Sequence, residues 1–307
     1  MTGYLGVGPA RPRGRPIGRL DALERRFGNR AGSRAYDLFV PSRQGGGVQL
    51  PLVVMLHGCS QTSRDFAIGT RMDELAEEQG LLVAYPDQPR SANMGKSWNW
   101  FRDGDQWRDR GEPSILAGLT RQVMQDFDVD PARVYVAGLS SGGAAAAVLA
   151  MAYPDLYAAV GIHSGLACGS ATSMAAALMA MRRGALLQPR RATHPMPTIV
   201  FHGDRDRTVS PVNGDQAIAQ CLPVVDLVTA IFNGRSDGGM EYTRTVLTER
   251  QGTWSSEQWV LHGGGHAWSG GHPSGSHTDS VGPDASREML RFFGSHARSD
   301  GPHFGGP

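Results

Sequence analysis

The sequence predicts an α/β protein whose mostly parallel central sheet is covered by helices on both faces. Buried strands are predicted from seven short apolar runs, at residues 35–40, 52–58, 81–86, 134–138, 158–165, 198–203 and 258–266. An uninterrupted apolar run indicates a strand buried on both faces, because a half-exposed strand alternates apolar with polar residues. Helical patterns separate most of these runs, and this alternation is typical of a parallel sheet.

Five segments predict helices, at residues 64–80, 112–127, 142–154, 214–222 and 284–298. In the first, apolar residues recur at three- and four-residue spacing between Phe66 and Ala76, and Gly80 stands where a helix C-cap belongs. In the last, Asp284 is the predicted N-cap. Strands and helices in this order favour chemistry at the carboxyl ends of the strands.

The chain of 307 residues is long enough for one large domain. We assign residues 34–298 to this domain, residues 1–33 to a flexible, arginine-rich N-terminal arm and residues 299–307 to a flexible tail. Both ends are rich in glycine, proline and charge, which is typical of frayed termini.

The formal net charge of +1 gives no electrostatic reason to expect nucleic acid or a membrane surface as a partner. The chain has no apolar run of membrane-spanning length and its N-terminus has no apolar export segment, so we expect a soluble protein. Three cysteines are too few for a disulfide framework. Catalysis or small-ligand binding is therefore the expected class of function.

Residues 138–142 read Gly-Leu-Ser-Ser-Gly and match the G-x-S-x-G pattern of a nucleophile turn. In a chain with 41 glycines the pattern alone is weak, and Ser140 in a glycine turn is otherwise a helix N-cap. The context favours the nucleophile, since a strand-like run precedes the serine and small residues from Gly143 to Ala147 follow it. A serine hydroxyl at such a turn is exposed at a helix N-terminus.

A serine nucleophile needs a histidine base oriented by a carboxylate, in the chain order Ser, Asp, His for this strand–turn–helix arrangement. Asp204 and Asp206 follow one predicted strand, and His262 and His266 flank a glycine turn after another. We prefer Asp206, which a loop can carry back toward the imidazole, and assign Asp204 to bracing the turn. His266 lies beyond the glycines, whereas His262 ends the strand and is the better structural residue.

Two further features complete the predicted site. The backbone amides of Cys59, in the segment LHGCSQT, and of Ser141, directly after the nucleophile, are the predicted oxyanion donors. A metal site at His262, His266, His272 and His277 is disfavoured, because the glycines between them prevent the helix that would align a histidine pair. No metal and no cofactor are expected.

These motifs resemble the family of polyhydroxybutyrate depolymerases and related esterases, which have the α/β-hydrolase fold. The resemblance runs from about residue 34 to residue 298 and includes the segments LHGCSQT, WNWF, VYVAGLSSGG, TIVFHGDRDRTV and GGGHAWSGG in the family's order. It implies Ser140, Asp206 and His266 as the catalytic triad, in agreement with the residue patterns. Many relatives are secreted, so the resemblance suggests an extracellular protein where the N-terminus suggests a cytoplasmic one.

One departure concerns Cys59, because many relatives have a second cysteine just before the WNWF aromatics and this chain has Ser97 there. We therefore expect Cys59 to lack a disulfide partner. Trp98, Trp100 and Trp268 are predicted either to line a substrate groove or to belong to the core. The stretch from Ser164 to Pro197 is short for a lid domain, so an open site without a large lid is expected.

The sequence thus favours a serine carboxylester hydrolase acting on short-chain esters or hydroxyalkanoate oligomers. A feruloyl or acetyl xylan esterase, a serine peptidase and a non-catalytic binding protein on the same fold are the alternatives. The expected partner is an ester substrate, small or oligomeric, and the sequence leaves the oligomeric state open.

Overall fold

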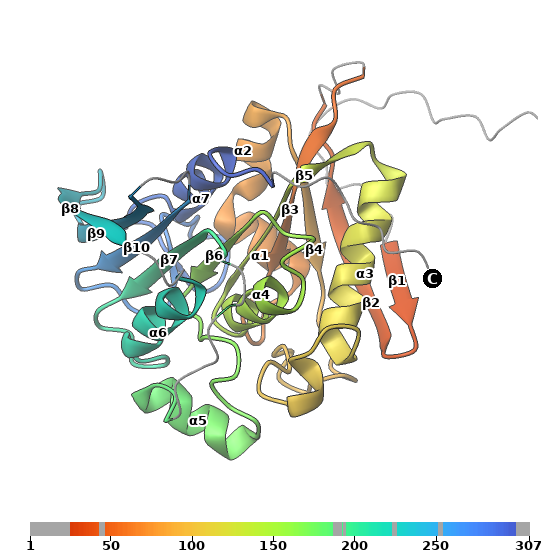
Figure 1. Cartoon of the computed structure of the whole chain (residues 1–307), viewed down its shortest axis with the longest axis horizontal. Coiled ribbons are helices and arrows are strands. Elements are labelled where there is room, and N and C mark those ends of the chain that lie inside the picture. The colour runs from red at the N-terminus through yellow and green to blue at the C-terminus, as the bar shows by residue number, and fades with distance from the viewer. Residues whose placement is uncertain are drawn as a thin grey trace, which may run out of the picture.

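One ten-stranded sheet runs through the computed structural model, which describes residues 25–42, 47–186, 192, 195–222, 226–250 and 254–298 (Figure 1). Its strands are β1 (Arg25–Asn29), β2 (Gly32–Phe39), β3 (Leu50–Leu56), β4 (Leu82–Pro86), β5 (Val129–Leu139), β6 (Ala159–His163), β7 (Thr198–Gly203), β8 (Leu227–Arg235), β9 (Glu241–Glu249) and β10 (Ser255–Leu261). Their order across the sheet is β1-β2-β4-β3-β5-β6-β7-β10-β9-β8. The six central strands, β4, β3, β5, β6, β7 and β10, are parallel to one another. At one edge β2 and β1, and at the other β9 and β8, are each antiparallel to the next strand toward the centre of the sheet.

Helices cover both faces of this sheet, as the sequence predicts. One face carries α3 (Gly111–Asp126), α4 (Ser141–Ala152) and α6 (Val212–Cys221), and the other carries α1 (Ser63–Thr70), α2 (Met72–Gln79) and α7 (Ala285–Gly294). Strand β3 shows why its run is apolar throughout: Val54 and Leu56 pack into one layer, and Val53 and Met55 into the other. Two smaller features, the 3-10 helix η1 (Asp103–Asp105) and the short pair β11 (Trp268–Ser269) with β12 (Thr278–Asp279), lie in loops.

The predicted helix at residues 64–80 is two helices, because the chain turns at Arg71 with a left-handed φ of 53°. A loop from the C-terminal part packs into this break. The His272 amide donates to the Gly69 carbonyl at 2.8 Å, and the Ser286 hydroxyl donates to the Thr70 carbonyl at 2.6 Å. In a continuous helix these two carbonyls would accept hydrogen bonds from amides of the next turn. Here they accept from residues elsewhere in the chain. Gly80 caps α2 and Asp284 caps α7, both as predicted.

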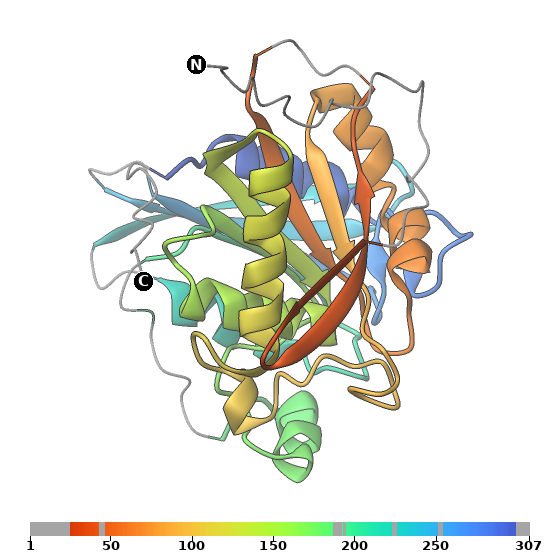
Figure 2. The same cartoon turned by 90° about the vertical axis from the view of Figure 1, so that its right-hand side faces the viewer.

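The domain begins earlier than residue 34, since β1 and β2 form a hairpin beside α3 (Figure 2). Phe27 lies against α3 so closely that a Cβ at Gly118 would stand 2.3 Å from its ring. Strand β1 was not predicted because its sequence, RRFGN, contains two arginines and resembles the charged residues assigned to the arm. The rest of the expected arm, residues 1–24, and the expected tail, residues 299–307, lie outside the described residues.

Three further elements were not predicted. Strands β8 and β9 were missed because their sequences, LVTAIFNGR and EYTRTVLTE, carry polar residues among the apolar ones; β8 is largely exposed and β9 is half-buried. Helix α5 (Met174–Arg183) lies in the segment expected to be short for a lid, and Figure 1 shows it standing apart from the sheet. It lines one side of the site described below and forms no large lid. Among the described residues, no helix has both the length and the apolar character needed to cross a membrane.

A buried carboxylate fixes the loop between β4 and α3. Glu112, in the first turn of α3, accepts hydrogen bonds from the Arg34 guanidinium at 2.9 Å and from the Gln88 side chain. It also accepts from the Asn99 amide and from the Asn99 side chain, both at 2.7 Å. Burial raises the pKa of Glu112, whereas Arg34 and these donors favour its charged form. Strand β2, the end of β4 and the loop at Asn99 thus meet on one side chain.

We expect Glu112→Gln to destabilise the fold by about 3–5 kcal/mol, because it leaves the buried Arg34 without its counter-charge. Urea denaturation measures this loss. The matched control is Glu74→Gln, which breaks an exposed pair with Arg71 and should cost less than about 1 kcal/mol. Similar small losses in both variants would contradict the role given to Glu112.

Candidate active site

Ser140 stands at the sharp turn between β5 and α4, with φ 55° and ψ −117°. A positive φ is uncommon for a residue other than glycine and stores strain, which is typical of functional turns. The Ser140 amide donates to the His163 carbonyl at 2.8 Å, which ties the turn to the end of β6. The turn therefore holds the serine at the carboxyl end of the parallel strands, as the sequence predicts.

The glycines of this turn are required by close backbone packing. A Cβ at Gly142 would lie 2.0 Å from the Leu56 carbonyl oxygen and 2.6 Å from that of His57. A Cβ at Gly138 would lie 2.4 Å from the Gly142 carbonyl carbon. Helix α4 thus starts in contact with the end of β3, and the turn has no space for larger residues.

His266 bridges the two other predicted triad residues. Its Nε2 lies 2.8 Å from the Ser140 Oγ, and its Nδ1 lies 2.7 Å from the Asp206 Oδ2. His266 lies in the loop after β10, and Asp206 lies in the loop after β7, which are neighbouring strands of the sheet. The structure thus brings together three side chains that are up to 126 residues apart in the chain.

The Asp206 carboxylate is buried and fully hydrogen-bonded. Its Oδ1 accepts from the amides of Thr208 and Val209, each at 2.9 Å. Its Oδ2 faces His266 and, at 3.5 Å, the Nε2 of His202. Burial by itself raises the pKa of Asp206, but the hydrogen bonds from His202, His266 and Val209 outweigh it and hold that pKa well below its usual range. The Asp206 side chain is therefore an ionised carboxylate that accepts a hydrogen bond from the Nδ1–H group of His266.

Asp204 has a different environment, as the sequence analysis expects. Its carboxylate accepts from the Gly263 amide at 2.7 Å and from the His262 Nδ1 at 3.0 Å. These contacts brace the turn after β10 and involve neither Ser140 nor His266. The side chains of Asp204 and His262 are 39% and 41% exposed, whereas the Asp206 side chain is fully buried. The two aspartates thus divide into one that supports a turn and one that contacts the histidine.

Two histidines near the triad were not singled out by the sequence analysis. Burial lowers the pKa of His163 to about 3, so its ring is neutral and its Nε2 accepts the Ser269 amide at 3.0 Å. This bond ties β6 to the loop that follows His266. His202 donates its Nε2 proton to the Val209 carbonyl at 2.9 Å, which holds the ring beside Asp206. In the sequence, each of these histidines stands at or near the end of an apolar strand run, and this position is the signal that could have identified them.

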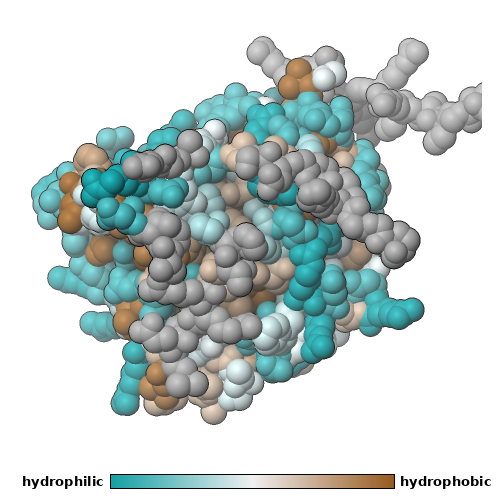
Figure 3. Space-filling view, in the orientation of Figure 1, coloured by the Kyte–Doolittle hydropathy of each residue, from teal (hydrophilic) through white to brown (hydrophobic). Residues whose placement is uncertain are grey.

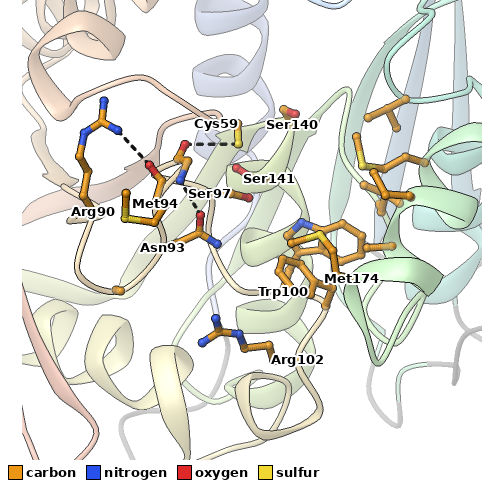
Figure 4. A pocket seen from close by; sticks show the side chains of 18 of the residues that line it. Cys59, Arg90, Asn93, Met94, Ser97, Trp100, Arg102, Ser140, Ser141 and Met174 are labelled. Carbon is orange, nitrogen blue, oxygen red and sulfur yellow. Dashed lines mark hydrogen bonds between the residues drawn. The ribbon is translucent and has the colours of Figure 1, made fainter.

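Two amide groups beside Ser140 have no acceptor within the described residues: those of Cys59, after β3, and of Ser141, the first residue of α4. Figure 4 shows both residues next to Ser140 at the wall of the cavity. The first amides of a helix are unsatisfied within the helix and attract negative charge. These are the two donors that the sequence predicts for an oxyanion.

The turn that carries Cys59 is held from two sides. The Gly58 amide donates to the Gln61 side chain at 2.8 Å, and that side chain donates in turn to the Ser276 carbonyl at 3.0 Å. The Ser60 amide donates to the Gly95 carbonyl at 2.8 Å. The Cys59 backbone therefore has a fixed direction, while its thiol is exposed. All three cysteines of the chain are free thiols in the structure, and Ser97 occupies the position of the expected missing partner.

A cavity of about 720 Å³ opens beside Ser140, which is within the usual size range of small-molecule sites. Its apolar side comes from the loop at Trp100, from the segment after β6 and from α5, with Trp100, Phe101, Leu166, Met174, Leu178, Met181 and Val209. Its polar side comes from the loop after β4, with Arg90, Asn93, Ser97 and Arg102. Among the described residues that line it there is no aspartate or glutamate. Figure 4 shows Trp100 and Met174 on the side opposite Arg90.

Of the three tryptophans predicted to line a substrate groove, one lines the cavity and two belong to the core. Trp100 lines the cavity. Trp98 and Trp268 do not line it: they are 0% and 1% exposed and belong to the core, which corrects their assignment to the substrate groove. Each buries its ring because its indole N–H has an acceptor, the His57 carbonyl at 2.9 Å for Trp98 and the Ser286 hydroxyl at 3.0 Å for Trp268. In the described part of the chain, no three histidine, cysteine or acidic side chains gather into a metal-binding group.

Comparison with known proteins finds esterases and a depolymerase. Poly(3-hydroxyalkanoate) depolymerase C of Paucimonas lemoignei is 31% identical over 252 residues, which cover 78% of this chain but 60% of the depolymerase. Feruloyl esterase B of Neurospora crassa is 26% identical over 261 residues, 79% of this chain and 82% of that esterase. The solved structure of an acetyl xylan esterase from Aspergillus awamori covers 85% of this chain and 94% of its own, with a TM-score of 0.61 at 19% identity, and shows the α/β-hydrolase fold.

The family described as esterase PHB depolymerase matches residues 34–244, a segment that contains Ser140 and Asp206 and ends before His266. Because this match spans well over half of the 307 residues, the chain belongs to the PHB depolymerase family of esterases.

Proposed function

We propose that this chain is a serine carboxylester hydrolase in which Ser140 is the nucleophile, His266 the base and Asp206 the residue that orients the base. The observation that carries this proposal is the pair of contacts made by His266, at 2.8 Å to the Ser140 Oγ and 2.7 Å to the Asp206 Oδ2. A hydroxyl within hydrogen-bond reach of an oriented imidazole is the arrangement that activates serine.

The reaction follows from these contacts. His266 Nε2 takes the hydroxyl proton as the Ser140 Oγ bonds to the ester carbonyl carbon, and the carbonyl oxygen becomes negatively charged. The amides of Cys59 and Ser141 donate to this oxygen. The carbon–alkoxy bond then breaks, and His266 returns the proton to the leaving alcohol. Water attacks the acyl-serine by the same route, which releases the acid and restores Ser140.

The cavity favours an acyl or alcohol part larger than acetate. An acetyl group fills little of a space of about 720 Å³, whereas two or three hydroxyalkanoate units place methyl groups against Met174 and Trp100. We therefore infer short hydroxyalkanoate oligomers as the preferred substrates. The flat ring of Trp100 also fits an aromatic acyl group, which makes a feruloyl ester the second candidate.

The charges around the cavity argue against an aminopeptidase. A free amino terminus is recognised by carboxylates, and the described lining residues hold two arginines and no acid. Amide hydrolysis is therefore the activity that this site supports least.

A substrate panel tests the proposed activity and its preference. We expect a hydroxybutyrate trimer and p-nitrophenyl butyrate to be hydrolysed, p-nitrophenyl acetate and methyl ferulate more slowly, and an amide not measurably. Ser140→Ala should abolish each of these reactions. Amide cleavage without ester cleavage would overturn the proposal. Faster turnover of methyl ferulate than of the trimer would make a feruloyl ester, and not a hydroxyalkanoate oligomer, the preferred substrate.

The two aspartates provide a matched test of the triad. Asp206→Asn should lower kcat by about 10³–10⁴-fold, because an amide no longer stabilises the imidazolium and its N–H group favours the wrong tautomer of His266. Asp204→Asn should stay within about tenfold of the parent, because Asp204 contacts only the turn. Both variants are measured with p-nitrophenyl butyrate, with melting temperatures as the check on folding. A larger loss in a well-folded Asp204→Asn would exchange their roles.

Cys59 tests the oxyanion site, because the proposed donor is its backbone and not its thiol. Cys59→Ala keeps the amide and should leave kcat within about threefold, whereas loss of a donor costs about 10²–10³-fold. The same assay gives kcat, and titration of the denatured, unreduced protein should find three thiols in the parent and two in the variant. A hundredfold loss in a well-folded Cys59→Ala would remove Cys59 from the proposed site.

A further inference from the structure

Strand β8 forms an unusually apolar edge of the sheet. It pairs with β9 on one side and is the last strand in the order of the sheet. Its side chains Val228, Ile231 and Phe232 are 44%, 64% and 52% exposed. Figure 3 shows hydrophobic residues at this side of the molecule, where Figure 1 places β8 and β9. An edge strand with free backbone groups and exposed apolar side chains is a template for pairing with another strand.

The opposite edge of the same sheet makes the contrast clear. Strand β1 has five residues and carries Arg25 and Arg26, which is a common protection against edge pairing. Strand β8 has nine residues, LVTAIFNGR, with no proline and no charge before Arg235. Of the two edges, only β8 combines length, apolar side chains and an uncharged centre.

We propose that β8 pairs antiparallel with β8 of a second copy of this chain, about a two-fold axis at Ile231. This pairing would join the two ten-stranded sheets edge to edge. Closed two-fold contacts between identical patches are the commonest arrangement in homodimers. This contact pairs the free edge of β8 in one copy with that of the other, so no unpaired β8 edge remains to add a third copy.

The sequence of β8 is complementary to itself in this register. With Ile231 packed against its own copy at the axis, Phe232 lies opposite Ala230 and Val228 lies opposite Gly234, so these two large side chains each meet a small one. Thr229 lies opposite Asn233, which allows a polar pair on the other face. Cross-strand pairs of this kind stabilise antiparallel sheets.

The charges at the ends of β8 match in the same register. Arg235 would lie opposite Leu227 of the other copy, next to that copy's Asp226. Each of these charges already has one partner in its own chain, Glu241 for Arg235 and Arg250 for Asp226, and all four are exposed. The register thus brings Arg235 of one copy next to Asp226 of the other, an opposite-charge contact that an unrelated strand would not supply.

Sedimentation velocity on the full chain tests the proposal. We expect a species of twice the 32.9 kDa chain mass that dissociates on dilution. Ile231→Lys puts two like charges in contact across the axis and removes apolar burial, so it should weaken dimerisation by about 100-fold. The control Val48→Lys, at a residue 63% exposed and away from β8, should remain dimeric. Hydrolysis of p-nitrophenyl butyrate should be unchanged in both variants.

Two further variants test the register. An equal mixture of Ile231→Lys and Ile231→Asp should form a heterodimer, because opposite charges then face each other at the axis. Ile231→Cys should form an intermolecular disulfide under oxidising conditions, and Thr229→Cys alone should not.

Three results would overturn the proposal. One is a parent protein that stays monomeric at all accessible concentrations, and another is an Ile231→Lys variant that dimerises as the parent does. The third is open-ended aggregation of the parent that Ile231→Lys abolishes, since it would show an unprotected edge and no closed dimer. If a monomeric parent binds a polyhydroxybutyrate film and Ile231→Lys does not, β8 is a polymer-contacting edge and the dimer is excluded.

Discussion

The close approach of α4 to the end of β3 is the constraint on which the site depends. At Gly142 a single added carbon would come within 2.0 Å of the Leu56 carbonyl oxygen, so the helix starts in backbone contact with the strand. This contact leaves the Ser140 backbone in a left-handed conformation at the top of the sheet. It also places the first amides of α4 beside the Cys59 turn, which follows the same strand. The proposed nucleophile and the proposed oxyanion donors therefore share one structural cause.

The positions of His266 and Asp206, the proposed base and its carboxylate, depend on further hydrogen bonds from residues that do not touch Ser140. His202 and two backbone amides surround Asp206, and His163 binds the loop beyond His266. A buried histidine with a pKa of about 3 is neutral at neutral and mildly acidic pH, so its Nε2 remains a hydrogen-bond acceptor there. His163 can therefore hold the loop without adding a positive charge next to His266.

Much of this arrangement was predictable, because it rests on short-range signals. Apolar runs identified every parallel strand of the ten-stranded sheet, and the glycines around Ser140 report directly on the tight turn. The order of Asp206 and His266 along the chain follows from where parallel strands end. What the sequence did not reveal depends on tertiary contacts. Trp98 and Trp268 looked like groove walls because their acceptors, on His57 and Ser286, lie 41 and 18 residues away in the chain. Strands β8 and β9 were not predicted because polar residues interrupt their apolar ones, and α5 was not predicted because its run MAAALMAM is apolar throughout and shows no helical period.

The break between α1 and α2 has a consequence for the order in which the protein becomes active during its synthesis. His272, in the loop that follows His266, and Ser286, in the first turn of α7, donate to the carbonyl groups of Gly69 and Thr70, which leave the ribosome some 200 residues earlier. A nascent chain that ends after Asp206 lacks His266, the proposed base, and the contacts that hold its loop. On the proposed mechanism, activity therefore requires the C-terminal part of the domain as well as the segment that carries Ser140.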